Sequence, residues 1–225
     1  MINAVHPDNI MMGILQAPNE SKSIELKPSI LWPLTIDALQ KEGKAQEIIK
    51  TILALSNTYN GGKIILGIEK DKDRYVVKGM DDKDLASYDN DMIFEQVRNY
   101  GDPEPAFQVH HVKYQDNDKE KSVIVFVVQG LRISPVICNN IRNLSKLESS
   151  VIYIRTDKPE TKKIIQVVEM REVVDIAVER EIELFSRRFQ ALAGKALQMQ
   201  KGTESHNDEA KYKSETDRIL GVIRL

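Results

Sequence analysis

A helix that ends at a pair of glycines and runs at once into an apolar strand lies at the centre of this sequence. Residues 45–59 carry isoleucine and leucine at helical spacing, and Asn60-Gly61-Gly62 breaks that pattern. The stretch KIILGIE (63–69) follows directly as a β-branched, apolar run, which is typical of a buried strand. We therefore expect a helix that feeds a buried strand through a glycine turn and packs closely on it.

Further strands and helices surround this unit. A second helix is predicted over 89–101, with an Asp or Asn cap and a glycine stop, and a long charged helix over 163–200. Short strands are predicted over 21–29, 74–80, 106–115, 122–130, 134–140 and 150–157. This order predicts an α+β fold, a mixed β-sheet with packed helices, followed by a long C-terminal helix. The predicted segments are an N-terminal arm (1–17), one domain (18–175), a helical extension (176–200) and a polar, mobile tail (201–225).

Composition limits the function classes. The chain has 225 residues, of which 41% are apolar, so it can form a substantial core. Its net charge of −2 means that any contact with a polyanion needs a local basic patch. Cys138 is the one cysteine, which excludes an intrachain disulfide and a zinc site built from several cysteines. No signal peptide, membrane span of ~20 apolar residues or phosphate-binding P-loop motif is found, so we expect a cytoplasmic protein without a membrane partner.

The stretch NESKSIELKPS (19–29) concentrates charge that a strand does not need for folding. Residues two apart on a strand share a face, so Glu25 and Lys27 should point the same way. Glu20 lies five residues before Glu25 and would face the opposite side of a flat strand. The two glutamates meet only if the chain bends near residues 21–23.

Three pieces in order resemble the Schlafen-type AlbA-like domain: ESKSIELK, IIKTILALSNTYNGGKIILGIEKD and YIRTDKPETKKI. The family pattern pairs E-S-x-x-x-E-x-K with a helix ending in A-x-x-N-T-x-G-G, a strand with a central glycine and a nearby acid, and a late strand ending in Arg. The matching residues are Glu20, Ser21, Glu25, Lys27, Ala54, Asn57, Thr58, Gly61, Gly62, Gly67, Glu69, Tyr153 and Arg155. This chain departs from the pattern by one additional residue before Gly61, where it has both Tyr59 and Asn60.

The resemblance implies a nucleic-acid-binding domain, in its sharper form a metal-dependent endoribonuclease. In Schlafen nucleases three acids are catalytic, and they match Glu20, Glu25 and Glu69, the last being Glu where those enzymes usually have Asp. The resemblance thus predicts a Mg²⁺ or Mn²⁺ site on these three carboxylates. Lys27 would stabilise charge that develops on the phosphate.

Two readings remain open for these motifs. Exposed glutamates near a lysine are often a solvated strand edge, and a non-catalytic DNA- or RNA-binding or regulatory module would keep the same residues. Gly61 and Gly62 either serve helix–strand packing or, with Asn57, present backbone amides to a phosphate. Basic residues that could contact RNA or DNA are Lys22, Lys27, Lys63, Arg155, Lys158, Lys162 and Lys163.

Other residues have simpler explanations. His110 and His111 should point to opposite faces of one strand and so cannot share a site. Cys138 suits a small core position, and Trp32 an anchor that packs its proline-flanked loop. The long helix leaves Leu184, Phe185 and Phe189 without a partner in the domain, which predicts a homo-oligomer formed by helix pairing.

Overall fold

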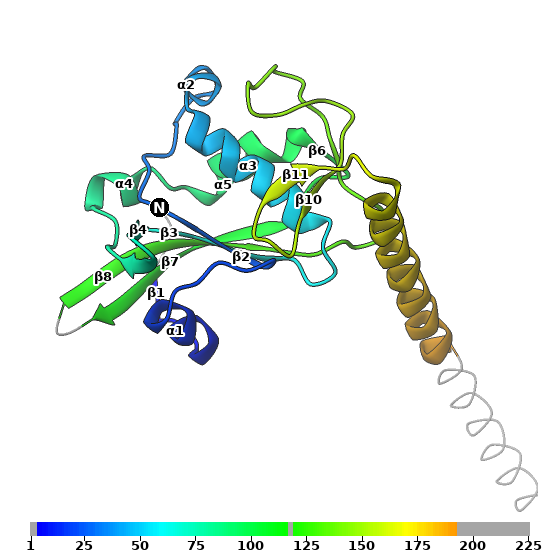
Figure 1. Cartoon of the computed structure of the whole chain (residues 1–225), viewed down its shortest axis with the longest axis horizontal. Coiled ribbons are helices and arrows are strands. Elements are labelled where there is room, and N and C mark those ends of the chain that lie inside the picture. Colours follow the sequence, from blue (N-terminus) through cyan, green and yellow to red (C-terminus); the bar gives the residue numbers. More distant parts are fainter. Residues whose placement is uncertain (1–3, 117–118, 193–225) are drawn as a thin grey trace, which may run out of the picture. The chain divides into compact units, whose positions relative to one another are not determined.

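The computed structural model describes residues 4–116 and 119–192 of the chain (Figure 1). It divides the chain into a compact unit, residues 1–178, and a second unit, residues 179–225. The tail predicted over 201–225, and the end of the helical extension predicted to residue 200, lie outside the described residues.

A five-stranded mixed sheet forms the centre of the compact unit, which confirms the predicted α+β class (Figure 1). Its strands, in spatial order, are β1 (Ala4–Val5), β7 (Phe107–Asp116), β8 (Lys119–Val128), β3 (Gly62–Leu66) and β2 (Ile24–Lys27). The two outer pairs, β1 with β7 and β2 with β3, are parallel, and the two inner pairs are antiparallel. The segment that carries Glu25 and Lys27 is therefore an edge strand.

Side chains alternate across this sheet and build two cores. One face carries Ile64 and Phe126 beneath α3 (Gly43–Ser56) and α5 (Asn90–Val97). The opposite face carries Ile65 and Val125 and packs on α1 (Asn9–Gln16). Fully burying such a side chain contributes about 1.5–3 kcal/mol. Because β3 and β8 supply buried side chains to both cores, this strand pair stabilises the packing of helices on each face of the sheet.

Helix α3 is the predicted central helix, and it begins at Gly43, slightly before the apolar pattern does. Within the segment predicted as an arm, Ala4–Val5 form β1 and Asn9–Gln16 form α1, with Met11 and Leu15 buried. Three helices fall where no helix was predicted: α1, α2 (Ile36–Lys41) and α4 (Asp82–Ala86). The helix predicted over 89–101 ends as α5 and a short 3₁₀ turn, η1 (Arg98–Tyr100).

Three two-stranded sheets complete the compact unit. They are β4 (Ile68–Asp71) with β5 (Arg74–Val77), β10 (Tyr153–Arg155) with β11 (Thr161–Lys163), and β6 (Gly101–Asp102) with β9 (Ile137–Cys138). The β10–β11 hairpin lies against α3 (Figure 1). Its basic residues therefore approach the same helix that precedes the glycine turn.

A final helix runs over residues 167–192. In the compact unit its Val173 is buried with Leu131 and Ile154. In the second unit the helical residues Ile182 and Phe185 are exposed. Within the part of the chain that the structure describes, no helix has the length and apolar character needed to cross a membrane.

Candidate functional site

Glu25 and Lys27 share the α3 side of the sheet edge. In the β2–β3 register Glu25 pairs with Ile64 and Lys27 with Leu66, both of which belong to the core beneath α3. The Lys27 Nζ lies 2.6 Å from the Glu25 Oε1. The prediction that these two side chains point the same way is confirmed.

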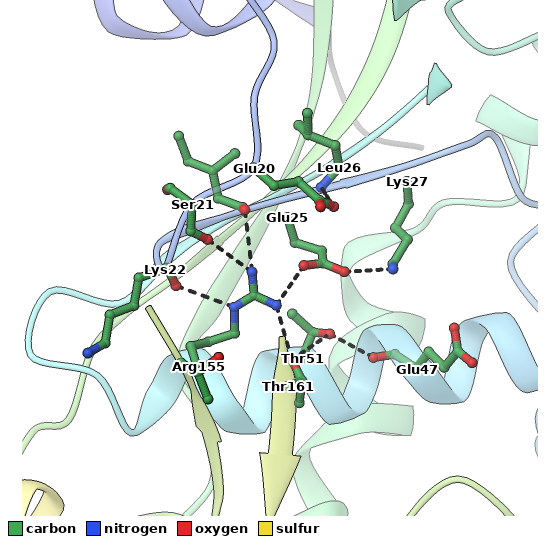
Figure 2. A network of polar contacts seen from close by, with 12 residues as sticks. Glu20, Ser21, Lys22, Glu25, Leu26, Lys27, Glu47, Thr51, Arg155 and Thr161 are labelled. Carbon is green, nitrogen blue, oxygen red and sulfur yellow. Dashed lines mark hydrogen bonds and ion pairs between the residues drawn. The ribbon is translucent and has the colours of Figure 1, made fainter. Parts of the chain in front are cut away.

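Arg155 is the second cation on Glu25 (Figure 2). Its Nη1 lies 2.6 Å from the Glu25 Oε2, and its side chain is only 1% exposed. The same guanidinium donates to the carbonyl oxygens of Ser21 at 3.0 Å and Lys22 at 3.3 Å, and to the Thr161 Oγ1 at 3.2 Å. Arg155 therefore clamps strand β10 onto the chain just before β2, and in doing so it neutralises a buried carboxylate.

The chain bends between the two glutamates, which is the condition that the sequence set for them to meet. The backbone groups of Ser21 and Ile24 hydrogen-bond to each other at 3.0 and 3.2 Å, which turns the chain back on itself. The Glu20 Oε1 then accepts from the Leu26 amide at 3.3 Å, and its Oε2 accepts from the Tyr75 hydroxyl at 2.6 Å. Burial, followed by the hydrogen bond to Glu20, raises the pKa of Tyr75 to about 12.

Glu69 is carried away from the other two acids by a break in its strand. The strand predicted over 63–69 stops at Gly67, where φ is +99°, and the chain continues as β4 in a different sheet. Glu69 pairs with Val76, whereas the neighbouring Lys70 pairs with Tyr75. Because successive residues of a strand alternate in direction, Glu69 points away from the face on which Tyr75 meets Glu20.

These placements do not form a three-carboxylate metal site. Among residues 4–116 and 119–192, no group of three or more His, Cys, Asp or Glu side chains is arranged to hold a metal ion. Glu25 already faces two cations, and both oxygens of Glu20 accept hydrogen bonds from protein donors. The residues therefore do not fit Mg²⁺ or Mn²⁺ as arranged, and the metal-binding role of Glu20, Glu25 and Glu69 stays a prediction.

Asn57 holds the end of α3 in place. Its side chain is buried, and its Nδ2 donates to the carbonyl oxygens of Val136 at 2.9 Å and Tyr153 at 3.0 Å. Its Oδ1 accepts from the Val136 amide at 2.7 Å. With the bond from Nδ2 to the Leu53 carbonyl oxygen, all four bonds are internal, so the contact with a phosphate predicted for Asn57 has no exposed amide to make it.

The glycine pair allows backbones to approach closely. A Cβ on Gly61, where φ is +70°, would lie 2.0 Å from the Val128 carbonyl oxygen. A Cβ on Gly62 would lie 2.3 Å from the Ser23 carbonyl oxygen. The close approach of this turn to the end of β8 and to Ser23 therefore accounts for both glycines, and their contact with nucleic acid stays a prediction.

Acidic partners neutralise the lysines of the β10–β11 hairpin and of the facing turn. The pairs are Lys22 with Asp157, Lys158 with Glu160, Lys162 with Glu169 and Lys163 with Glu148. Lys63 is half-buried on β3 and has no ion pair with another described residue. The sequence cluster RTDKPETKK thus does not form an unpaired basic surface.

A cavity of about 370 Å³ lies beside the ion-paired residues Glu25, Lys27 and Arg155, which also line it. Its cations are Lys27, Lys50 and Arg155, and its carboxylates are Glu25, Glu47 and Glu160. Sequence reasoning missed Lys50, which stands three residues after Glu47 on the face of α3 that looks toward β10 and β11. The spacing of three residues between Glu47 and Lys50 was the signal in the sequence that both lie on one face of the helix.

The three cations and three carboxylates that line this cavity balance, and two further lysines pair with its carboxylates from outside. Glu47 and Glu160 each have a lysine partner, Lys146 at 3.9 Å and Lys158 at 3.8 Å, that does not line the cavity. The Lys50 Nζ lies 4.9 Å from the centre of the Tyr153 ring, and no described carboxylate forms an ion pair with it. Since Glu25 holds two cations, the cavity and its ion-pair partners carry an excess of positive charge.

Three simpler predictions are confirmed. Trp32 is fully buried, and its Nε1 donates to the Gln96 side chain at 2.7 Å, so it anchors its loop. Cys138 is buried, and burial raises the pKa of its thiol to about 11. His110 and His111 alternate along β7, which places them on opposite faces of the sheet.

Comparison with known proteins identifies the family of this chain. No curated protein matches it. Among solved structures it is similar to the DIP2311 protein of Corynebacterium diphtheriae, with 15% sequence identity and a TM-score of 0.41. That similarity covers 68% of this chain and 25% of the other. The family model described as Schlafen, AlbA_2 matches residues 20–164, which contain the E-x-K strand, the glycine turn and Arg155, and the chain therefore belongs to this family.

Proposed function

We propose that this protein binds nucleic acid as a non-catalytic module and that a backbone phosphate occupies the cavity beside Glu25. Membership of the Schlafen, AlbA_2 family supports a role with RNA or DNA. The observation that carries the proposal is the neutralisation of buried Glu25 by both Arg155 and Lys27. An acid held this way adds no net repulsion toward a phosphate, and the two other lining carboxylates, Glu47 and Glu160, have lysine partners outside the cavity.

Each residue has a distinct part in this proposal. Lys27 and Lys50 supply ammonium donors to the phosphate, and Thr161 supplies a hydroxyl at the cavity wall. Arg155 does not reach the ligand, because its donors are occupied by carbonyl oxygens and by Glu25. Arg155 and Glu25 instead fix where Lys27 stands, which makes them positioning residues.

Metal-dependent endoribonuclease activity is the sharper alternative that the family resemblance implies. It needs carboxylates that converge on one ion, and the described positions of Glu20, Glu25 and Glu69 do not supply them. The reaction is tested directly by incubating labelled tRNA, single-stranded RNA and DNA with the protein in Mn²⁺ or in EDTA, beside a Glu25→Gln variant. Cleavage that both EDTA and this substitution abolish would replace the binding proposal with the nuclease.

Binding is tested by fluorescence anisotropy with labelled single-stranded RNA, single-stranded DNA and duplex DNA at 50 and 200 mM salt. We expect Lys27→Gln and Lys50→Gln each to weaken binding and to reduce the slope of log K against log salt by about 1. Lys44→Gln is the matched control, since Lys44 is an exposed lysine on α3 that does not line the cavity. Equal binding by all three variants, or no binding of any probe at 50 mM salt, would refute this phosphate site.

A further inference from the structure

The second unit carries an apolar stripe on its helix. Ile182, Phe185, Phe189 and Leu192 are exposed by 59, 68, 64 and 66%, and they follow one another at intervals of three, four and three residues. The Phe185 and Phe189 rings stack with their centres 6.4 Å apart. Alternating intervals of three and four are the spacing of a coiled-coil seam, in which the side chains pack between those of a second helix.

We propose that this stripe pairs two copies of the chain as an antiparallel helical dimer. In this dimer Ile182 of one copy packs against Phe185 of the other, and the two-fold axis repeats the contact. Phe189 packs on the helical turn that precedes Ile182 in the second copy. The proposal extends beyond nucleic-acid binding and does not depend on it.

Charges beside the seam select this orientation. Glu181 and Arg188 are both exposed, and each stands directly before a seam residue, Ile182 and Phe189. In antiparallel coiled coils such positions face their equivalents on the other helix, so the alignment of Ile182 with Phe185 sets Glu181 opposite Arg188 of the second copy. The two-fold axis makes this pair twice.

Other alignments fit the charges less well. An antiparallel alignment that sets Ile182 opposite Leu192 matches Glu181 with Lys195 in the sequence, but it also brings Arg188 against Arg188 of the second copy, which is repulsive. A parallel alignment sets Glu181 opposite Ser186, so that no opposite charge meets it. The charge pattern therefore favours a second copy of this chain, in the register that makes two opposite-charge pairs and no like-charge pair.

The test measures the mass of the full-length protein across a concentration series by sedimentation. We expect a dimer for the unmodified chain and a monomer for Phe185→Glu. Arg188→Glu replaces two attractive pairs with two repulsive ones and should weaken the dimer by about tenfold. Arg187→Glu is the matched control, because Arg187 is an exposed neighbour that stands on the far side of the helix from the seam.

Restoration and crosslinking establish the orientation. The double variant Glu181→Arg/Arg188→Glu should recover the affinity lost in Arg188→Glu, since it only exchanges the partners. Mixing Ile182→Cys with Phe185→Cys chains should give a disulfide between the two variants, and buried Cys138 should not compete. Three results would overturn the proposal. The unmodified chain could stay monomeric across a 100-fold range of protein concentration, the double variant could fail to recover the affinity, or crosslinks could form only between identical positions.

Discussion

Removing Arg155 should destabilise the compact unit more than removing any surface cation. The Arg155→Met variant leaves Glu25 buried with one cation in place of two, and it removes the donors from the Ser21 and Lys22 carbonyl oxygens. Breaking a buried ion pair in this way costs about 3–5 kcal/mol. Whole domains have stabilities of about 5–15 kcal/mol, so the loss is a large fraction of the total.

Urea unfolding followed by the fluorescence of buried Trp32 measures this loss without screening the ion pair. Lys22→Met is the control, because it removes an exposed pair with Asp157 and should cost less than about 1 kcal/mol. The double variant Glu25→Leu/Arg155→Met removes both charges and should lose less than the sum of the single variants. A loss below about 1 kcal/mol for Arg155→Met, or strict additivity in the cycle, would show that the buried pair does not hold β10 to the turn.

Three further predictions concern the glycine turn, the final helix and the Glu20 contact. Gly62→Ala should lower the melting temperature because of its 2.3 Å clash, whereas Gly13→Ala, with open space around it, should raise stability by roughly 0.5–1 kcal/mol; thermal melts compare them. The hydrogen bond from Lys162 lowers the pKa of Glu169 from 4.5 to about 2, so its stabilisation is complete above pH 4.5 and is lost toward pH 2. The deficit of Glu169→Gln in urea unfolding should accordingly shrink as the pH falls, and a constant deficit would refute this. Glu20→Gln should lower the pKa of Tyr75 from about 12 toward 10, as followed by NMR of the ring carbon; an unchanged value would exclude Glu20 as a cause.

The central helix, the glycine turn and the β2 face were predictable because each depends on local chemistry. Helical spacing located α3, and the alternation of a strand placed Glu25 beside Lys27. The strand pattern also showed that the two glutamates could meet only with a bend at residues 21–23, and the chain does turn there. The family was predictable because its motifs retain their order along the chain.

The rest depends on contacts that spacing does not encode. Arg155 was expected to touch nucleic acid, yet its guanidinium is buried against carbonyl groups more than 130 residues earlier in the chain. The break at Gly67 was invisible because the apolar pattern continues through it to Ile68. Lys50 was not predicted because it lines the cavity only through the packing of α3 against the distant β10–β11 hairpin, which helical spacing does not encode.

Gly67 gives one backbone torsion an unusual influence over the acid that follows it. The chain leaves the central sheet there, and a Cβ at this position would lie 3.1 Å from the backbone of Gly79. The backbone conformation of Gly67 therefore sets the direction of the β4–β5 hairpin and the position of Glu69. The choice between Glu and Asp at residue 69 does not change that direction. An Asp at this position would point the same way as Glu69, whereas a different backbone conformation at Gly67 would change the direction of the whole β4–β5 hairpin.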